Sequence, residues 1–557
     1  MAARTTRPPE HGRFLYSYAM NVSSSKSRQS NYFLVLLAGV VHATSFAPDP
    51  LPLQALPFVQ LITLAVLFAC SINANSTRQA LLQAWLFGVG NFATGLYWLY
   101  ISMHDFGHLH PALAVLAVAL LAAALAFFIV AAIWLIRLLQ PRRGRPWLQA
   151  LLLATITASV WTLFEWLRGS LLTGFPWLNI AYAHVDGFFA GWAAILGSYA
   201  ISWSAAFCAA ALSLLTPSQM QKKSPAVALL VSIFIGAASL YWQQIEWAKA
   251  EGSPILARLV QGNVPQSQKF DPQYLLDGIR SYQHMSALPP KEPGAEPQII
   301  VLPETVVPMM QYLIPEQEWQ VWIDIAKRQN ATLILGVPMS DPNNPSYYTN
   351  SLITIGPDTS AAEILQRQTM QYNKYHLVPF GEFVPQGFRW FIDMMQIPLG
   401  EFARGDTRQR NFSLNNLLIA PNICYEDVFG EEIIRAVQPA EYDNGANLLV
   451  NSSNLAWFGD SWALRQHLQM SRVRAMETAR PMLRATNTGA TAAVDHTGAI
   501  IAMVTPNQRA ILDVEIQGMS GLTPYVRWGN TPIIAFSLLV CVLAGAGRIL
   551  RRRSTQD

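Results

Sequence analysis

The sequence predicts a polytopic α-helical membrane protein with eight spans and one α/β domain inserted before the last span. The 557 residues are 52% hydrophobic and 13% charged, which is too apolar for a soluble protein of this length. Seven apolar stretches of about membrane-spanning length occupy the first half of the chain, and an eighth lies near its C-terminus. The segment between the last two alternates strand-like and helix-like runs, which indicates the inserted domain.

The predicted spans set the domain boundaries. They lie at residues 32–47, 53–72, 81–102, 112–139, 148–167, 192–215, 226–243 and 531–549. The first is short, but a polar stretch precedes it and another span follows closely, so we interpret it as an uncleaved helix. We expect an N-terminal segment 1–30, a seven-helix membrane domain 31–244, an inserted domain 245–529, an eighth helix 530–550 and a basic tail 551–557.

Lys and Arg residues indicate the orientation of the chain. With eight spans, the flanking basic residues gather on one side, at Arg4, Arg7, Arg13, Lys26, Arg28, Arg78, Arg142, Arg143, Arg145, Lys222, Lys223, Arg548, Arg551, Arg552 and Arg553. Because basic loops face the cytoplasm, both chain ends are predicted to be cytoplasmic and the inserted domain extracytoplasmic. The net charge is only +4 and the basic residues do not interleave with aromatic ones, which argues against a nucleic-acid partner.

The inserted domain contains eight apolar runs of strand length. They lie at 255–263, 297–305, 331–339, 350–357, 415–426, 447–454, 481–489 and 491–504. Helix-like segments at 315–330 and 461–480 separate some of them. Open α/β sheets expose their chemistry at the C-terminal ends of strands, so polar residues there are the candidates for function.

Cys424 is the one cysteine outside a strongly apolar run. The other three, Cys70, Cys208 and Cys541, lie inside predicted spans or next to them. A lone thiol is either an inert buried side chain, which is common for free cysteine, or a reactive group. The predicted extracytoplasmic position favours reactivity, because an unpaired thiol in an oxidising compartment is a liability.

Glu304 and Lys374 also follow strand-like runs, and with Cys424 they form a chemically complete set. A thiol of ordinary pKa is only partly ionised near neutrality, so it needs a base or a neighbouring cation. Glu304 can take the proton, and Lys374 can stabilise negative charge on the thiolate and on an oxyanion. A backbone N–H just after Cys424, at a predicted helix start, would be a second oxyanion donor.

Several segments around these residues carry a resemblance. They are QGNVPQSQKF (261–270), LPET (302–305), YNKYHLVPFGEFVP (372–385), NICYE (422–426), SSNLAWFGDS (452–461), RPMLRATNTG (480–489) and, in the membrane part, FEWLRGSLLTGFPWLN (164–179). The chain resembles the carbon-nitrogen hydrolase (nitrilase-like) superfamily, and within it the membrane-bound members that acylate lipoproteins. The resemblance implies an αββα sandwich, no metal, no cofactor, and a bacterial inner membrane with the catalytic domain on the periplasmic side.

The resemblance also implies roles for individual residues. Glu304 would be the general base, Lys374 the oxyanion stabiliser and Cys424 the nucleophile, with Glu382 as a second, supporting carboxylate. Relatives usually carry WPE where this chain has Leu302 before Pro303 and Glu304, a departure that we expect to change only packing.

Four further residues match the family pattern less specifically. Tyr425 and Glu426 flank the nucleophile, and they are either supporting residues or simply a packed aromatic ring and a helix N-terminal carboxylate. Phe270 stands where relatives often carry Trp, and it is either a mobile gate for substrate or core. Trp457 is a substrate-binding candidate, but Leu455 replaces an Asp of the relatives nearby, so we assign its loop no catalytic role.

The reaction implied by the resemblance is acyl transfer in two steps. Cys424 takes a fatty acyl chain from a membrane phospholipid as a thioester, and the α-amine of a diacylglyceryl-cysteine apolipoprotein then accepts it. The protein is expected to act as a monomer. Two alternatives remain: a membrane-tethered amidase or nitrilase that uses water as the acceptor, and a transporter or scaffold without activity.

Two polar groups in the membrane part have two interpretations each. Glu165 and Arg168 form either a lipid headgroup site or a helix-surface pair. The cluster of His104, Asp105, His108 and His110 is interpreted as a polar loop rather than a metal site, because nothing else supplies a ligand set.

Overall fold

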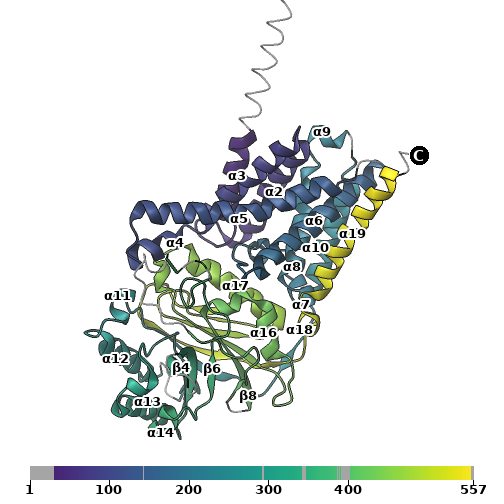
Figure 1. Cartoon of the computed structure of the whole chain (residues 1–557). Helices are drawn as coiled ribbons and strands as arrows, with labels where there is room; N and C mark the ends of the chain where they lie inside the picture. Colours follow the sequence, from purple (N-terminus) through teal and green to yellow (C-terminus); the bar gives the residue numbers. More distant parts are fainter. Residues whose placement is uncertain are drawn as a thin grey trace, which may run out of the picture.

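The computed structural model describes residues 31–141, 144–221, 223–290, 294–341, 347–385, 387, 389–390, 402–414 and 416–553. The predicted N-terminal segment 1–30 lies outside these residues, as does most of the basic tail. Helices from both ends of the chain form one bundle, and the α/β domain lies against one end of it (Figure 1).

Five helices of the bundle are long and apolar enough to cross a membrane. They are η1 with α2 (Leu53–Asn73), α5 (Pro111–Leu139), α6 (Pro146–Ser170), α10 (Ala226–Gln243) and the last helix, α19 (Thr531–Arg553), with its apolar part Thr531–Leu550. They coincide with five of the eight predicted spans. The other bundle helices are Asn31–Ala43, α3 (Thr77–Gly95) and α8 (Ser198–Ser213).

For the other three predicted spans, the helices of the structure begin or end at other residues than predicted. The first helix ends at Ala43. The third span becomes α3, followed by the short α4 (Trp98–Ile101) and a π-helical turn η2 (Ser102–Phe106). The sixth is split into α7 (Trp192–Leu196) and α8 by Gly197, whose φ is +76° and where a Cβ would lie 2.2 Å from the Tyr525 ring. Only glycine combines this backbone conformation with so close a contact.

The inserted domain is built on two six-stranded sheets. The first has the order β13-β2-β3-β4-β5-β6 and the second β12-β11-β10-β9-β8-β7. The first comprises β13 (Ala510–Ile516), β2 (Ile255–Gln261), β3 (Ile299–Val301), β4 (Thr332–Ser340), β5 (Tyr348–Ile355) and β6 (Gln371–Asn373). The second comprises β12 (Ile500–Met503), β11 (Ala492–Val494), β10 (Met482–Thr486), β9 (Leu448–Ser453), β8 (Leu417–Ile423) and β7 (Phe412–Leu414). Strands β2, β3 and β4 are parallel, as are β8, β9 and β10.

Alternating side chains arrange these sheets in four layers. In β2, Leu259 packs between the two sheets against residues such as Ile423, whereas Val260 faces the outer helices. The outer helices of the first sheet are α12 (Leu275–Ser286), α13 (Glu316–Gln329) and α14 (Ala361–Leu365), and those of the second are α16 (Gly430–Val437) and α17 (Trp462–Thr478). The domain is therefore an αββα sandwich, as the resemblance implied.

Most predicted strands and both predicted helices of the domain are confirmed, with one correction. The apolar run 491–504 is a hairpin, because β11 and β12 pair antiparallel around the turn between them. The short remaining elements are β1 (Lys249–Ala250), β14 (Met519–Ser520), α9 (Pro217–Met220), α11 (Gln266–Lys269), α18 (Pro524–Trp528), η3 (Ile180–His184), η4 (Gln311–Leu313), η5 (Cys424–Val428) and η6 (Ala456–Phe458).

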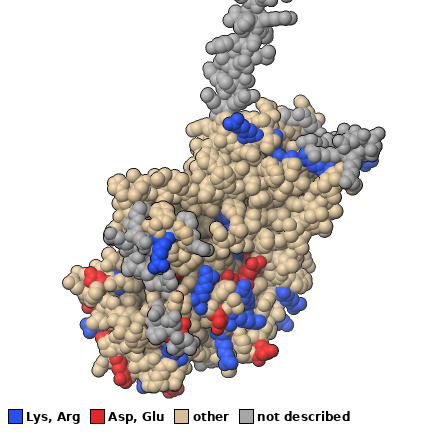
Figure 2. Space-filling view, viewed as in Figure 1, with Lys and Arg blue, Asp and Glu red and all other residues tan. Residues whose placement is uncertain are grey.

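Helix α17 joins the domain to the membrane helices (Figure 1). Its Arg472 forms a two-pronged ion pair with Asp186, with N···O distances of 2.5 and 2.7 Å. Gln466 of α17 accepts hydrogen bonds from the indoles of Trp98 and Trp177. Charged side chains gather on the α/β domain, whereas the visible helical surface carries few, with Lys and Arg at the end away from that domain (Figure 2).

Candidate active site

The three predicted triad residues follow strands of the two facing sheets. Glu304 is the third residue after β3, Lys374 follows β6 directly, and Cys424 follows β8 directly. Cys424 opens the 3₁₀ turn η5 with a φ of +52°, an uncommon conformation for a residue with a side chain. The expected helix start is thus a tight turn, and α16 begins only at Gly430.

Lys374 lies between two carboxylates. Its Nζ is 2.8 Å from Glu382 Oε1 and 3.4 Å from Glu304 Oε1, and its side chain is 1% exposed. The other Glu382 oxygen accepts the backbone N–H of Val378 at 2.8 Å. Because Glu382 binds Lys374 more closely than Glu304 does, it holds the ammonium in place while Glu304 keeps an oxygen for other partners.

Two asparagines hold Glu304. Asn350 Nδ2 donates to Glu304 Oε1 at 2.7 Å and to Glu382 Oε1 at 2.9 Å. The backbone N–H of Asn454 donates to Glu304 Oε2 at 3.0 Å. The loop after β9, to which the sequence assigned no catalytic role, therefore contacts the predicted base through its backbone.

Electrostatics at Cys424 oppose its ionisation in the resting site. Burial raises the pKa of the thiol, the Glu304 carboxylate raises it further, and Lys374 lowers it. Burial also disfavours charge on Lys374, but Glu382 and Glu304 outweigh it and hold the pKa of the ammonium above its usual value. The site thus keeps a permanent cation beside a protonated thiol, which suits a nucleophile that ionises when its base takes the proton.

A buried network supports the turn that carries Cys424. Asn451 Nδ2 donates to the Cys424 carbonyl at 3.1 Å. Asp427, in the same turn, pairs with His467 Nε2 at 2.5 Å and with Arg484 Nη1 at 3.1 Å. These contacts stabilise the unusual backbone conformation of Cys424.

The Glu426 carboxylate accepts hydrogen bonds from several backbone and side-chain donors. Its Oε1 accepts the backbone N–H of Tyr375 at 2.7 Å and of His376 at 3.1 Å, and its Oε2 accepts that of Ile423 at 2.7 Å. The Tyr372 hydroxyl donates to both oxygens at 3.0 Å. Glu426 therefore connects the Lys374 strand end to the nucleophile strand, which is more than a helix N-terminal carboxylate would do.

The other three candidates make no described hydrogen bond with Glu304, Lys374 or Cys424. Tyr425 is buried, and its hydroxyl donates to the carbonyl of Gly174 in the membrane domain at 3.2 Å. Phe270 is 52% exposed, which excludes the interpretation as core. Trp457 packs edge-on against Phe106 of η2, with ring centroids 5.8 Å apart. Aromatic side chains thus line the junction between the two parts of the molecule.

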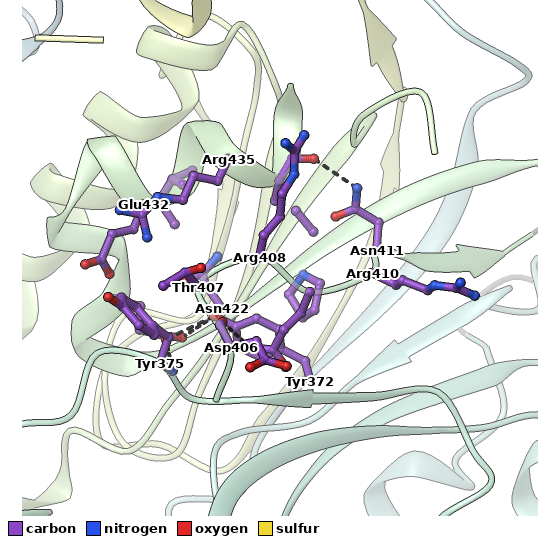
Figure 3. A pocket seen from close by; sticks show the side chains of 16 residues that line it. Tyr372, Tyr375, Asp406, Thr407, Arg408, Arg410, Asn411, Asn422, Glu432 and Arg435 are labelled. Atoms are coloured by element: carbon purple, nitrogen blue, oxygen red, sulfur yellow. Dashed lines mark hydrogen bonds between the residues drawn. The ribbon is translucent and has the colours of Figure 1, made fainter. Parts of the chain in front are cut away.

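A pocket is lined by Glu426 and by residues of the segments around Tyr372, Arg408 and Glu432 (Figure 3). Glu432 and Arg435 lie on one side of it, and Arg408 and Asn411 on the other. The residues that line it include none of the three triad residues. The pocket is therefore separate from the chemistry at Cys424.

Glu165 and Arg168 are buried, so they are not an exposed helix-surface pair, and both line a pocket in the membrane part. Arg168 donates to the carbonyl of Phe175 at 2.8 Å and to Asn179 Oδ1 at 2.6 Å. Glu165 accepts the backbone N–H of Ile180 at 2.9 Å. The two side chains hold the loop after α6.

Among the described residues, no group of three or more His, Cys, Asp or Glu side chains is arranged to hold a metal ion.

Sequence reasoning missed Asn350, Asn454 and Lys269. Lys269 Nζ donates to the Glu304 carbonyl at 3.0 Å. Lys269 and Asn454 had a signal in the sequence, since they lie within the quoted segments 261–270 and 452–461. Asn350 lies inside β5, where an asparagine has no distinctive pattern.

Comparisons with known proteins cover both parts of the chain. Residues 38–211 match the family model of the apolipoprotein N-acyltransferase N-terminal domain, and residues 256–525 match that of carbon-nitrogen hydrolase. The apolipoprotein N-acyltransferase of Bordetella bronchiseptica is 46% identical over 531 residues, covering 92% of this chain and 96% of the relative. That of Ralstonia nicotianae is 39% identical over 515 residues, covering 92% and 93%. An amidase structure from Nesterenkonia sp. aligns with 51% of this chain and 96% of its own, at 16% identity and a TM-score of 0.35.

Proposed function

The chain belongs to the apolipoprotein N-acyltransferase family, enzymes that N-acylate lipoproteins, and we propose that it does so through a thioester on Cys424. The observation that carries this proposal is the shared Lys374 between Glu304 and Glu382 beside the buried thiol. This arrangement supplies a base, a fixed cation and a nucleophile in one site.

In the first step, Glu304 takes the thiol proton and the Cys424 sulfur attacks an ester carbonyl of a phospholipid. Lys374 and a backbone N–H of the turn stabilise the resulting oxyanion. The C–O bond then breaks, Glu304 returns the proton to the leaving alkoxide, and a lysophospholipid departs. The acyl chain remains as a thioester.

In the second step, the α-amine of a diacylglyceryl-cysteine apolipoprotein attacks the thioester. Glu304 accepts a proton from the amine, the C–S bond breaks, and the thiolate recovers a proton. An amide forms and the free enzyme returns. Glu304 therefore acts as base and acid in both steps, for which its position beside Lys374 is suited.

The same proposal includes the topology. The bundle would cross the bacterial inner membrane eight times, with α3, α8 and the helix Asn31–Ala43 completing the five long apolar helices. The domain 245–529 would lie on the periplasmic side, between the membrane domain 31–244 and the helix 530–550. One chain would suffice, because α17 and η5 contact the membrane domain of the same molecule.

Mass spectrometry tests the acyl-enzyme. The purified protein is exposed to phospholipid vesicles and digested, and the peptide that contains Cys424 is analysed. We expect a fatty acyl mass that hydroxylamine removes and that Cys424→Ala lacks. Cys208→Ala, a thiol of the membrane domain, is the matched control and should leave the adduct unchanged.

An acceptor peptide separates acyl transfer from hydrolysis. With a diacylglyceryl-cysteine peptide, we expect the peptide amine to be acylated and the adduct to disappear. Release of free fatty acid with an unmodified amine would support the water-using alternative. If no adduct forms under any lipid condition, the thioester mechanism is refuted.

A further inference from the structure

Lys269 is a second buried ammonium beside the site. It ends the short α11, its side chain is 5% exposed, and its Nζ lies 3.0 Å from the Glu304 carbonyl oxygen. The same turn is held from another direction, because Gln266 accepts a hydrogen bond from Asn454 Nδ2 at 2.9 Å. Since Asn454 also donates to the Glu304 carboxylate, α11 and Glu304 form one unit.

The charge of Lys269 has no carboxylate partner. Among the residues that the structure describes, no Asp or Glu oxygen forms an ion pair with its Nζ within 4.0 Å. An ammonium carries three donors, and the one described acceptor is a neutral carbonyl. Burial lowers the pKa of Lys269 to about 8, although Glu304 and Cys424 both favour its charge. A buried cation without an ion pair is costly, so its retention needs a reason.

Charge balance around the thiol supplies the reason. Lys374 alone faces the two carboxylates Glu304 and Glu382, which leaves this group one negative charge in excess. Arg484 is already paired with Asp427. Transfer of the Cys424 proton to Glu304 moves this negative charge from the carboxylate to the sulfur, so the excess of one negative charge stays in the group. Lys269 is the remaining cation whose charge interacts with both Glu304 and Cys424.

We propose that Lys269 is the second cation of the active site and that it lowers the cost of forming the Cys424 thiolate. It acts across Glu304 without touching the sulfur, so it is a positioning residue. When Glu304 takes the thiol proton, the negative charge moves to sulfur and Lys269 stabilises it there. The inference rests on Cys424 being the nucleophile.

The titratable and charged groups that face Cys424 come from six elements and loops. They are Glu304, Lys374, Glu382, Asp427, His467, Arg484 and Lys269. His467 donates Nε2–H to Asp427 and accepts at Nδ1 from Arg484, so it is neutral in this network. Among these seven residues, Lys269 is the one whose replacement breaks none of the described ion pairs or contacts with a carboxylate.

Alkylation of Cys424 as a function of pH tests the proposal. The full-length protein in detergent is treated with iodoacetamide, and the modified Cys424 peptide is quantified by mass spectrometry. We expect Lys269→Met to raise the apparent pKa of alkylation by about one unit, a tenfold slower reaction at a fixed pH below it. Lys269→Arg should keep the wild-type profile. Lys327→Met, which removes an exposed charge on α13, is the control.

Two outcomes would overturn the proposal: a wild-type profile for Lys269→Met, or a shifted profile for Lys269→Arg. A wild-type profile for Lys269→Met together with a raised KM for phospholipid in the acylation assay would assign the cation to a lipid headgroup. If Lys269→Met does not fold, Lys269→Gln, which keeps a donor for the Glu304 carbonyl, provides the measurement. Alkylation needs no substrate, so it evaluates Lys269 even if no acyl adduct forms and the proposed function fails.

Discussion

Asn350 donates a hydrogen bond of 2.7 Å to Glu304, and the same amide nitrogen lies 2.9 Å from Glu382. One neutral side chain therefore donates to both of the carboxylates that share Lys374. The site therefore depends on this amide as well as on the predicted triad. A neutral donor at position 350 adds no further charge to the two carboxylates and the ammonium.

Substitution of Asn350 should impair formation of the acyl-enzyme in a charge-dependent way. We expect Asn350→Ala to slow it about tenfold, because Glu304 loses a donor that positions it. Asn350→Asp should slow it about a hundredfold, because a third carboxylate raises the cost of the thiolate. The rate is measured as acyl adduct on Cys424 against time. Asn444→Asp, which adds the same charge at an exposed position, should match the wild type, and equal rates for both Asn350 variants would contradict the electrostatic explanation.

Replacement of Glu426 by Gln should loosen the nucleophile turn. An amide presents one acceptor oxygen where the carboxylate presents two, so the NH₂ group would face a backbone N–H, such as that of Ile423. We expect a loss of about 2 kcal/mol in the free energy of unfolding and slower acylation of Cys424. Thermal unfolding in detergent gives the first quantity. Glu431→Gln, an exposed neighbour, is the control, and a wild-type midpoint for Glu426→Gln would refute this role.

Gln466 should be important for the junction between the two parts of the molecule. Its Oε1 accepts the indole N–H of Trp177 at 2.7 Å and of Trp98 at 3.1 Å, and its Nε2 donates to Gly95 at 3.1 Å. The Trp98 indole also donates to the Gly95 carbonyl at 3.1 Å, so Gln466→Leu would leave the buried Trp177 indole N–H unpaired, and we expect it to cost about 2 kcal/mol. Gln466→Glu keeps the acceptor and should cost less. Chemical unfolding measures both, with the exposed Gln317→Leu as control, and a Leu variant as stable as the control would disprove the prediction.

Lys269 should leave a signature in the pH dependence of stability. Its pKa is about 8 in the folded protein against 10.5 for the free side chain, so between these values the unfolded state holds more protons. Stability should therefore rise with pH across this window, by up to about 3 kcal/mol relative to Lys269→Met. Unfolding midpoints of the wild type and the variant, measured at several pH values, give the difference. Parallel curves would show that the ammonium is not perturbed by burial.

The sequence predicted the scaffold well where structure is local. Composition and apolar length identified the membrane helices, and runs of strand length identified most strands of both sheets. The sequence-based prediction was less accurate where the interruption of a helix depends on a residue that is distant in the sequence. Gly197 interrupts an apolar stretch that reads as continuous, because the Tyr525 ring occupies the space beside it.

The chemical types in the site were also predictable, since Glu304, Lys374 and Cys424 each follow a strand-like run. Their supporting contacts were not. Asn350 lies inside β5 and Lys269 ends a four-residue helix, and no local pattern distinguishes either from a surface residue. Glu165 and Arg168 were interpreted from their helical spacing, but both turn toward the loop that follows their helix.

The sequence by itself determined that this chain is a membrane protein with an inserted α/β domain, and which thiol, carboxylate and ammonium lie at strand ends. These properties depend on composition and on short-range periodicity, which the chain carries in every conformation. Only the tertiary structure decided that Glu382 shares Lys374 with Glu304, that α17 joins the domain to the bundle, and that Lys269 forms no ion pair with any residue that the structure describes. Each of these depends on distances between segments far apart in the chain, and packing alone sets such distances.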